Sequence, residues 1–317
     1  MEKNSFKDFA VSEAVSAEGT DGCCPKAFLC AMLKTVGAIE ITRRGVVALF
    51  ATERRDLILK IAQNLRTLYK NEFPVDEGKG KNNAPRFELR VTKAAKQLLS
   101  DTRTMNVDGE NYTGFVEGIS REIVAQSCCA KSFVRGLFIG AGSVYVPEAT
   151  DDGARGDGYH LEFRLADQKT ANDLVSLLKT LGVNAKQSVR GINFLVYLKD
   201  KHAIFSLFQI LSLAESALKL DSIIRERELS GAINRKAICE AANLDKSYAA
   251  SAAHLNALQI IDRRDGLKSL PPSLRQTALA KIQNPRMSLQ ELADELGVSK
   301  SCLNHRLRKI MQIAQKN

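Results

Sequence analysis

The sequence lacks the features that mark membrane proteins and nucleotide-hydrolysing enzymes. No run of about eighteen apolar residues occurs in the chain, so no membrane-spanning helix is expected. The first 22 residues also lack the apolar centre of a signal peptide, so we expect a cytoplasmic protein without a membrane partner. No Gly-Lys-Ser/Thr phosphate-binding loop is present, which argues against a P-loop protein.

The patterns of metal sites and catalytic centres are missing as well. None of the seven cysteines forms a C-x-x-C pair, so we expect small buried thiols in a reducing compartment rather than a zinc site. The four histidines are scattered, without metal spacing and without a signature around a nucleophile. We therefore expect a protein that is not an enzyme, with no catalytic residues, no metal and no cofactor.

Positive charge is what the sequence has in excess. Its 46 lysines and arginines outnumber 36 acidic residues, for a formal net charge of +10. This balance favours a polyanionic partner, with a membrane surface as the competing explanation. Basic pairs at residues 43–44 and 54–55 either contact DNA or are simply solvated. A length of 317 residues, with 44% hydrophobic residues, allows two or more domains with cores of their own.

Two distant stretches resemble each other and predict an internal duplication. Residues 23–29 read CCPKAFL and residues 128–134 read CCAKSFV, at an offset of 105 residues. The same offset aligns Gly37 with Gly142. These identities at one offset indicate two repeats, at about residues 22–101 and 127–212.

Apolar periodicity predicts the same element order in both repeats: helix, strand, strand, helix, strand, helix. In the first repeat we expect these elements at 24–36, 38–42, 46–51, 53–69, 86–91 and 92–100. In the second repeat we expect them at 131–139, 143–146, 159–165, 168–181, 193–198 and 202–211. Two such units predict an α+β domain of pseudo-symmetric repeats with antiparallel sheets.

Residues 288–311 predict two short helices joined by a tight turn. Ser288 and Glu291 form a capping-box pattern, Gly297 is suited to end the first helix, and Ser299 can cap the second. The apolar stripe of the second helix consists of Leu303, Leu307 and Ile310. This pattern is typical of a helix-turn-helix, whose second helix lies in the major groove of DNA.

The polar face of that second helix carries the candidate contacts to double-stranded DNA. The segment from residue 299 onward is basic and holds no Asp or Glu. Asn304 and Arg308 can make bidentate contacts to base edges, whereas Lys and Ser suit phosphates. The alternative is an ordinary helical hairpin with a solvated basic face. The candidate DNA-binding residues are Ser299, Lys300, Ser301, Asn304, His305, Arg306, Arg308 and Lys309.

Residues 134–143 read VRGLFIGAGS, and residues 29–38 follow the same register more loosely. The former stretch resembles LAGLIDADGS, the hallmark helix of LAGLIDADG homing endonucleases, in its glycine, its leucine and the final Gly-Ser. In those nucleases the last acidic residue before Gly-Ser binds the catalytic metal. Val36 and Ala141 stand at these positions here, and neither can coordinate a divalent cation. The resemblance implies that the fold is retained and the nuclease site is lost.

Further matches lie at residues 159–162 (YHLE), around residues 234–243 (NR followed by EAAN) and at residues 299–309 (SKSCLNHRLRK). Together with the acid-free LAGLIDADG halves, they resemble the WhiA family of bacterial sporulation and cell-division transcription regulators. The resemblance implies a sequence-specific DNA-binding regulator at the nucleoid, without nuclease activity, and with other regulatory proteins as further candidate partners. Two alternatives stay open: a protein-recruiting scaffold with incidental DNA binding, and a divergent homing-type nuclease.

The expected domain plan has four parts. They are a mobile tail at 1–21, a degenerate LAGLIDADG-like domain at 22–212, a linker or connecting helix at 213–230, and a helical DNA-binding domain at 231–317. Within the last domain, helices are expected at 234–242 and 246–260. They are interpreted as packing helices, with a second helix-turn-helix as the alternative.

Overall fold

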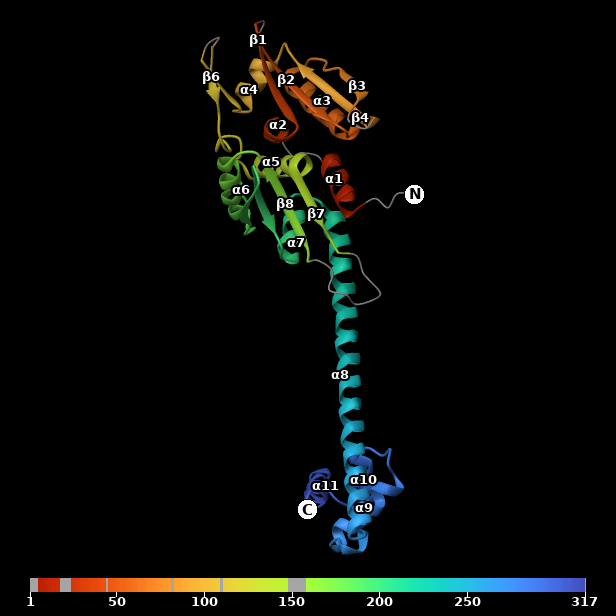
Figure 1. Cartoon of the computed structure of the whole chain (residues 1–317). Helices are drawn as coiled ribbons and strands as arrows, with labels where there is room; N and C mark the ends of the chain where they lie inside the picture. The colour runs from red at the N-terminus through yellow and green to blue at the C-terminus, as the bar shows by residue number, and fades with distance from the viewer. Residues whose placement is uncertain are drawn as a thin grey trace. The chain divides into compact units, whose positions relative to one another are not determined.

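The computed structural model describes residues 5–17, 24–43, 45–80, 83–108, 111–147 and 158–316. The chain divides into two compact units, Met1–Glu228 and Leu229–Asn317. The first unit mixes helices and sheets and the second is helical, so the predicted fold class is confirmed (Figure 1). Within the described residues, every helix is either too short or too polar to cross a lipid bilayer.

The first unit contains two copies of one arrangement. The first copy comprises α2 (Cys24–Thr35), β1 (Gly37–Thr42), β2 (Gly45–Thr52), α3 (Arg55–Tyr69), β3 (Val75–Lys79), β4 (Pro85–Val91) and α4 (Ala95–Asp101). The second comprises α5 (Ser127–Ala141), β7 (Gly142–Tyr145), β8 (His160–Leu165), α6 (Gln168–Thr180), β9 (Lys186–Arg190), β10 (Asn193–Leu198) and α7 (Lys201–Ile210). The hairpin of β5 (Met105–Asp108) and β6 (Asn111–Phe115) lies between them in the chain.

Each copy forms a four-stranded antiparallel sheet. The strand orders are β1-β2-β4-β3 and β7-β8-β10-β9, so equivalent strands occupy equivalent places in the two sheets. The predicted order of helices and strands is therefore present twice, with one strand in each copy that the sequence pattern missed.

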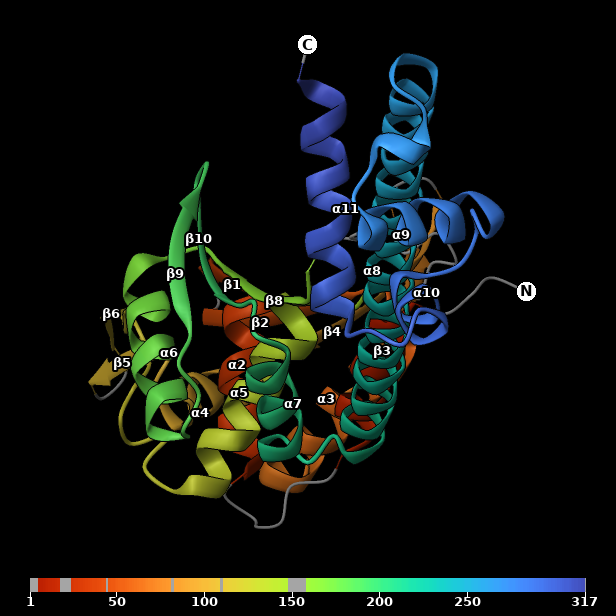
Figure 2. The ribbon, with the colours of Figure 1, turned by 90° about the horizontal axis from the view of Figure 1, so that it is seen from below.

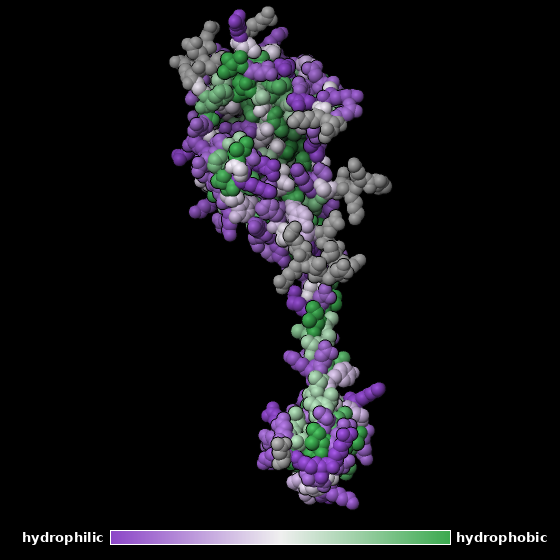
Figure 3. All heavy atoms as spheres, in the orientation of Figure 1, coloured by the Kyte–Doolittle hydropathy of each residue, from purple (hydrophilic) through white to green (hydrophobic). Residues whose placement is uncertain are grey.

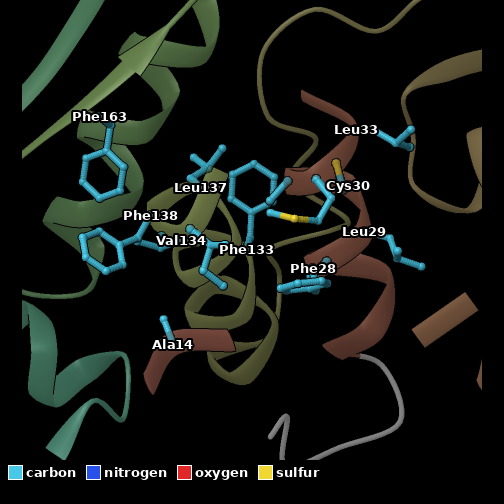
Figure 4. Packing of buried hydrophobic residues seen from close by; sticks show 14 of the residues in the cluster. Ala14, Phe28, Leu29, Cys30, Leu33, Phe133, Val134, Leu137, Phe138 and Phe163 are labelled. Atoms are coloured by element: carbon cyan, nitrogen blue, oxygen red, sulfur yellow. The ribbon is translucent and has the colours of Figure 1, made fainter. Parts of the chain in front are cut away.

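The hallmark helices α2 and α5 lie side by side in the first unit (Figure 2). Phe133, Val134 and Leu137 of α5 are fully buried, and Figure 4 shows them among the apolar side chains of this core. A Cβ atom on Gly136 would lie 2.7 Å from the Cβ atom of Ala31, too close for the helices as they stand. This glycine of the hallmark helix therefore serves close helix packing.

Part of the segment expected to be a mobile tail is an ordered helix, so that prediction was wrong for α1 (Phe6–Ser16). Its buried residues are Ala10, Val11, Ala14 and Val15. The Glu13 carboxylate accepts hydrogen bonds from the backbone N–H groups of Glu215 and Ser216, each at 2.8 Å. It thereby caps the first turn of α8 (Ala214–Arg264). Because its buried side chains are small, the apolar periodicity of this helix is weak in the sequence. Residues 1–4 and 18–23 lie outside the described part of the chain.

The expected linker is also helical. α8 includes residues 214–230 and continues through both helices expected at 234–242 and 246–260, so neither a packed pair nor a second helix-turn-helix forms there. No proline interrupts residues 214–264, and Gly231 is the one glycine among them, which is compatible with a continuous helix. Apolar side chains on this stretch stay exposed, and Figure 3 shows hydrophobic atoms on its surface. The exposed apolar residues of α8 include Leu218, Leu229, Ile233, Ile238, Leu244 and Tyr248.

The second unit is a helical domain with its own core. It contains the end of α8, α9 (Pro272–Gln283), α10 (Leu289–Glu295) and α11 (Lys300–Gln315). Its buried core residues are Leu258, Ile261, Leu270, Leu274, Ala278, Ala280, Leu292, Ala293, Leu303, Leu307 and Ile310. The segment predicted as a helix-turn-helix contains α10 and the first three turns of α11, so that prediction is confirmed, although α11 continues to Gln315.

Candidate nucleic-acid interface

The turn between α10 and α11 is fixed by hydrogen bonds at both helices. The predicted capping box is present: Ser288 Oγ accepts from the Glu291 N–H at 3.2 Å, and the Glu291 carboxylate accepts from the Ser288 N–H at 2.8 Å. These bonds, the backbone one foremost, hold the pKa of Glu291 below its usual range. Gly297 has φ +64°, the left-handed conformation that ends α10. The Val298 N–H then donates to the Ala293 carbonyl at 2.9 Å.

α11 is held in place along its buried face. Leu303, Leu307 and Ile310 are at most 1% exposed, as the predicted stripe requires. Ser299 Oγ accepts from the Cys302 N–H at 3.2 Å and caps the helix. Among the predicted DNA contacts, Ser299 therefore also has a structural role at the start of α11.

The far end of α11 is anchored by a residue that the sequence analysis missed. The Arg264 guanidinium, at the end of α8, donates from Nη2 to the Ile313 carbonyl at 3.1 Å and from Nη1 to the Lys316 carbonyl. Cationic groups stabilise the unpaired carbonyls at a helix C-terminus. Arg264 lies far from this helix in sequence, so no local signal identified it.

The outer face of α11 presents most of the predicted contacts to solvent. Lys300, Ser301, His305, Arg308 and Lys309 are exposed. The spacing of residues 301, 305 and 308 places them on one face of a helix, opposite the buried stripe. This face contains a hydroxyl, an imidazole and a guanidinium, and all three can hydrogen-bond to DNA.

Asn304 and Arg306 lie at the edges of this face and are half-buried. The Arg306 Nη1 atom reaches Thr277 Oγ1 on α9 at 3.5 Å, so Arg306 also links α11 to its neighbour. Next to it, α9 and α11 enclose a pocket of about 430 Å³ whose lining includes His305, Arg306 and Lys309. Three nitrogen-bearing side chains thus converge on the flank of α11.

The structure adds Arg286 as a basic residue near the start of α10. Its side chain is exposed and precedes the N-cap Ser288 by two positions. The N-terminus of a helix also carries partial positive charge. The sequence signal for Arg286 is a basic residue two positions before the N-cap Ser288.

The equivalents of the nuclease metal ligands carry no carboxylate. Val36 follows the end of α2, Ala141 ends α5, and both are partly buried against the core of the first unit. Among the described residues, no group of three acidic or histidine side chains is arranged to hold a metal ion.

Of the two basic pairs of the first repeat, the pair at residues 54–55 is engaged with other side chains. The Arg54 guanidinium donates to Asp56 at 2.5 Å and to Ser12 Oγ at 2.9 Å, and Arg55 forms an ion pair with Glu77 at 3.3 Å. Arg43 is exposed, and residue 44 lies outside the described residues. Paired guanidinium groups attract a phosphate backbone less than unpaired ones.

These features define a protein with a duplicated LAGLIDADG-like domain followed by a helix-turn-helix domain. The family model described as the WhiA LAGLIDADG-like domain matches residues 130–230, and the one described as the WhiA C-terminal HTH domain matches residues 233–314. The "Probable cell division protein WhiA" of Bacillus subtilis (strain 168) is 32% identical over 322 residues, which cover 98% of this chain and 96% of that protein. The chain belongs to the WhiA family.

Other relatives agree over similar lengths. The protein of the same name from Clostridium tetani (strain Massachusetts / E88) is 32% identical over 297 residues, or 91% of this chain and 90% of the relative. The fold is similar to the crystal structure of full-length DUF199/WhiA from Thermatoga maritima, with a TM-score of 0.57, 21% sequence identity and 98% of each chain covered.

Proposed function

We propose that this chain is a non-enzymatic, sequence-specific DNA-binding transcription regulator that acts on double-stranded DNA in the cytoplasm, at the nucleoid. The observation that carries this proposal is the exposed face of α11, with Ser301, His305 and Arg308 on a helix held by a fully buried stripe. The printed name of the relatives, "Probable cell division protein WhiA", supports cell-division genes as targets, and sporulation genes are the second candidate set.

In this proposal α11 enters the major groove. The Arg308 guanidinium can donate two hydrogen bonds to a guanine edge, and the Asn304 amide can pair with an adenine edge. Lys300 and Lys309 lie at suitable places on the helix for phosphates, and Arg286 is a further candidate. The capped turn and Arg264 hold the two ends of α11 in place. Recognition of base edges requires a helix that is fixed in this way.

The first unit in this proposal binds no catalytic metal and cleaves no DNA. Val36 and Ala141 cannot replace the carboxylates that such chemistry needs. This unit adds contacts to the DNA backbone or binds other regulatory proteins, and the ion pairs of Arg54 and Arg55 make these two residues weaker candidates for the DNA contacts.

Mapping of bound DNA across the genome tests the proposal, followed by titration of the full chain with the recovered site. The site and a scrambled duplex of the same length should differ in affinity by about 10³-fold or more, at several salt concentrations. A scaffold with incidental DNA binding predicts similar affinity for both duplexes and the same steep salt dependence for each. Equal affinities would therefore reject sequence-specific regulation.

A further inference from the structure

Three cysteine side chains from the two repeats meet inside the first unit. The Sγ atoms of Cys24, Cys128 and Cys129 all lie within 4.8 Å of one another. Cys24 is the first residue of α2, and the other two lie in the first turn of α5. Among the residues that the structure describes, this is the one group of three side chains with the ligand atoms for a metal ion.

The spacing of these sulfur atoms suits a shared cation. Zinc–sulfur bonds are about 2.3 Å long, so two thiolates on one tetrahedral zinc ion lie about 3.8 Å apart. Sulfur atoms that already lie within 4.8 Å of one another reach this separation by small side-chain rotations. A disulfide would use two of the three sulfur atoms, whereas a metal ion uses all of them.

The helix arrangement holds the ligands and suits the charge of such a centre. Three thiolates and one Zn²⁺ ion together carry a net charge of −1. The cysteines lie at the starts of α2 and α5, where the helix dipoles are positive. Arg135, further along α5, is 7% exposed and lies near Cys24, so its guanidinium adds positive charge beside the thiolates. Cys24 is held by a hydrogen bond from Ser132 Oγ to its carbonyl, at 3.0 Å.

A pocket of about 210 Å³ opens beside the cluster. Cys24, Ser132 and Arg135 line it, together with polar side chains of α3 that include Lys60 and Asn64. Zinc sites with three protein ligands hold water in the fourth position. The pocket offers room for that water and a route for the ion beside Cys24, which is 2% exposed.

We propose that Cys24, Cys128 and Cys129 form a thiolate site for a thiophilic divalent cation, with Zn²⁺ as the ion that its ligands suit. Soft thiolates select such ions over magnesium or calcium. Binding releases the three thiol protons to solvent, and the ion then joins the start of α2 to the start of α5. The site therefore fastens the two repeats together, and it is independent of the proposed DNA binding.

The test uses the reduced full chain, stripped with a chelator under anaerobic conditions and titrated with Co²⁺ as a spectroscopic substitute for Zn²⁺. The expected result is one equivalent of tightly bound Co²⁺, with thiolate-to-cobalt charge-transfer bands that Zn²⁺ abolishes. Zinc should also raise the melting temperature of the chain, because it binds only the folded site.

Cys128→Ser is the informative variant, because Cys128 is only partly buried and serine is close to cysteine in size. Altering the surroundings of metal ligands costs about 10–100-fold in affinity, so removing a ligand should cost about 100-fold or more. Cys239→Ser, at an exposed cysteine on α8, is the matched control and should bind Co²⁺ like the unmodified chain. Circular dichroism establishes that both variants are folded.

Three results would overturn the proposal. One is the absence of charge-transfer bands in the unmodified reduced chain. Another is a folded Cys128→Ser variant with unchanged bands and unchanged zinc affinity. A thiol count showing that Cys24 and Cys128 form a disulfide even in the presence of excess zinc and reductant would also reject a metal site, in favour of a redox pair.

Discussion

The specificity of DNA binding should depend on Arg308 more than on any equally charged residue elsewhere in the second unit. Its side chain is exposed on α11, whereas the opposite face is held by Leu303, Leu307 and Ile310. Replacement by alanine therefore leaves the domain folded, since surface substitutions usually change stability by less than about 0.5 kcal/mol. A change in binding then reports on the interaction of Arg308 with DNA itself.

The magnitude follows from the type of contact. A bidentate base contact contributes about 1–3 kcal/mol of discrimination. Since about 1.4 kcal/mol corresponds to a factor of ten, Arg308→Ala should lower the ratio of specific to non-specific affinity by about 5–150-fold. Asn304→Ala should act in the same direction.

The assay is a titration of each variant against the preferred site and a scrambled duplex at several salt concentrations. Arg263→Ala is the matched control, because Arg263 is an exposed arginine at the end of α8, outside the helix-turn-helix. Lys316 lies beyond the part of α11 that is expected to contact bases. If Arg263→Ala or Lys316→Ala weakens DNA binding, the affinity for both duplexes should fall by the same factor. Removing a side chain that binds one phosphate flattens the salt dependence by about one unit. An unchanged affinity ratio for both Arg308→Ala and Asn304→Ala would refute the assignment of α11 as the reading helix.

Three further outcomes are expected. Purified protein with Mg²⁺ or Mn²⁺ should leave supercoiled plasmid uncut on a gel, because Val36 and Ala141 supply no carboxylate; cleavage that copurifies with the chain would contradict this. Leu307→Ala should destabilise the second unit by about 2–5 kcal/mol and abolish specific binding, and a melting curve like that of the unmodified chain would contradict the core assignment. Burial, and secondarily Lys281, lowers the pKa of His254, so the unfolded state binds its proton first and stability should fall as the pH drops below about 6.5. Melting temperatures measured against pH should show this fall, and His254→Gln should reduce it.

The helices and strands that could be predicted from the sequence are those whose apolar periodicity and end signals lie within the element itself. α3 and the helix-turn-helix have clear apolar stripes, and the latter also has a capping box and a glycine in the turn. β3 and β9 were missed because they are short and mostly polar. They are strands because β4 and β10 offer them hydrogen-bonding edges, and that information lies in other segments of the chain.

Some residues of the candidate site could likewise be predicted from the sequence, and others could not. The exposed face of α11 could be predicted because helical periodicity alone determines which side chains share a face. Arg264 could not be predicted, because its partners are backbone carbonyls some fifty positions away. The role of Arg306 was also hidden, since its contact with Thr277 depends on how α9 and α11 pack.

The cysteine cluster shows why a repeat carries more information than motif spacing does. A search for C-x-x-C considers ligands close together in sequence, and the paired cysteines at residues 23–24 and 128–129 do not meet that criterion. In a pseudo-symmetric fold, however, equivalent helices pack against each other, as α2 and α5 do here. Residues at the starts of both helices can therefore meet across the pseudo-symmetry axis. The offset of 105 residues that revealed the duplication is also what relates the two cysteine pairs, whose described members share one site.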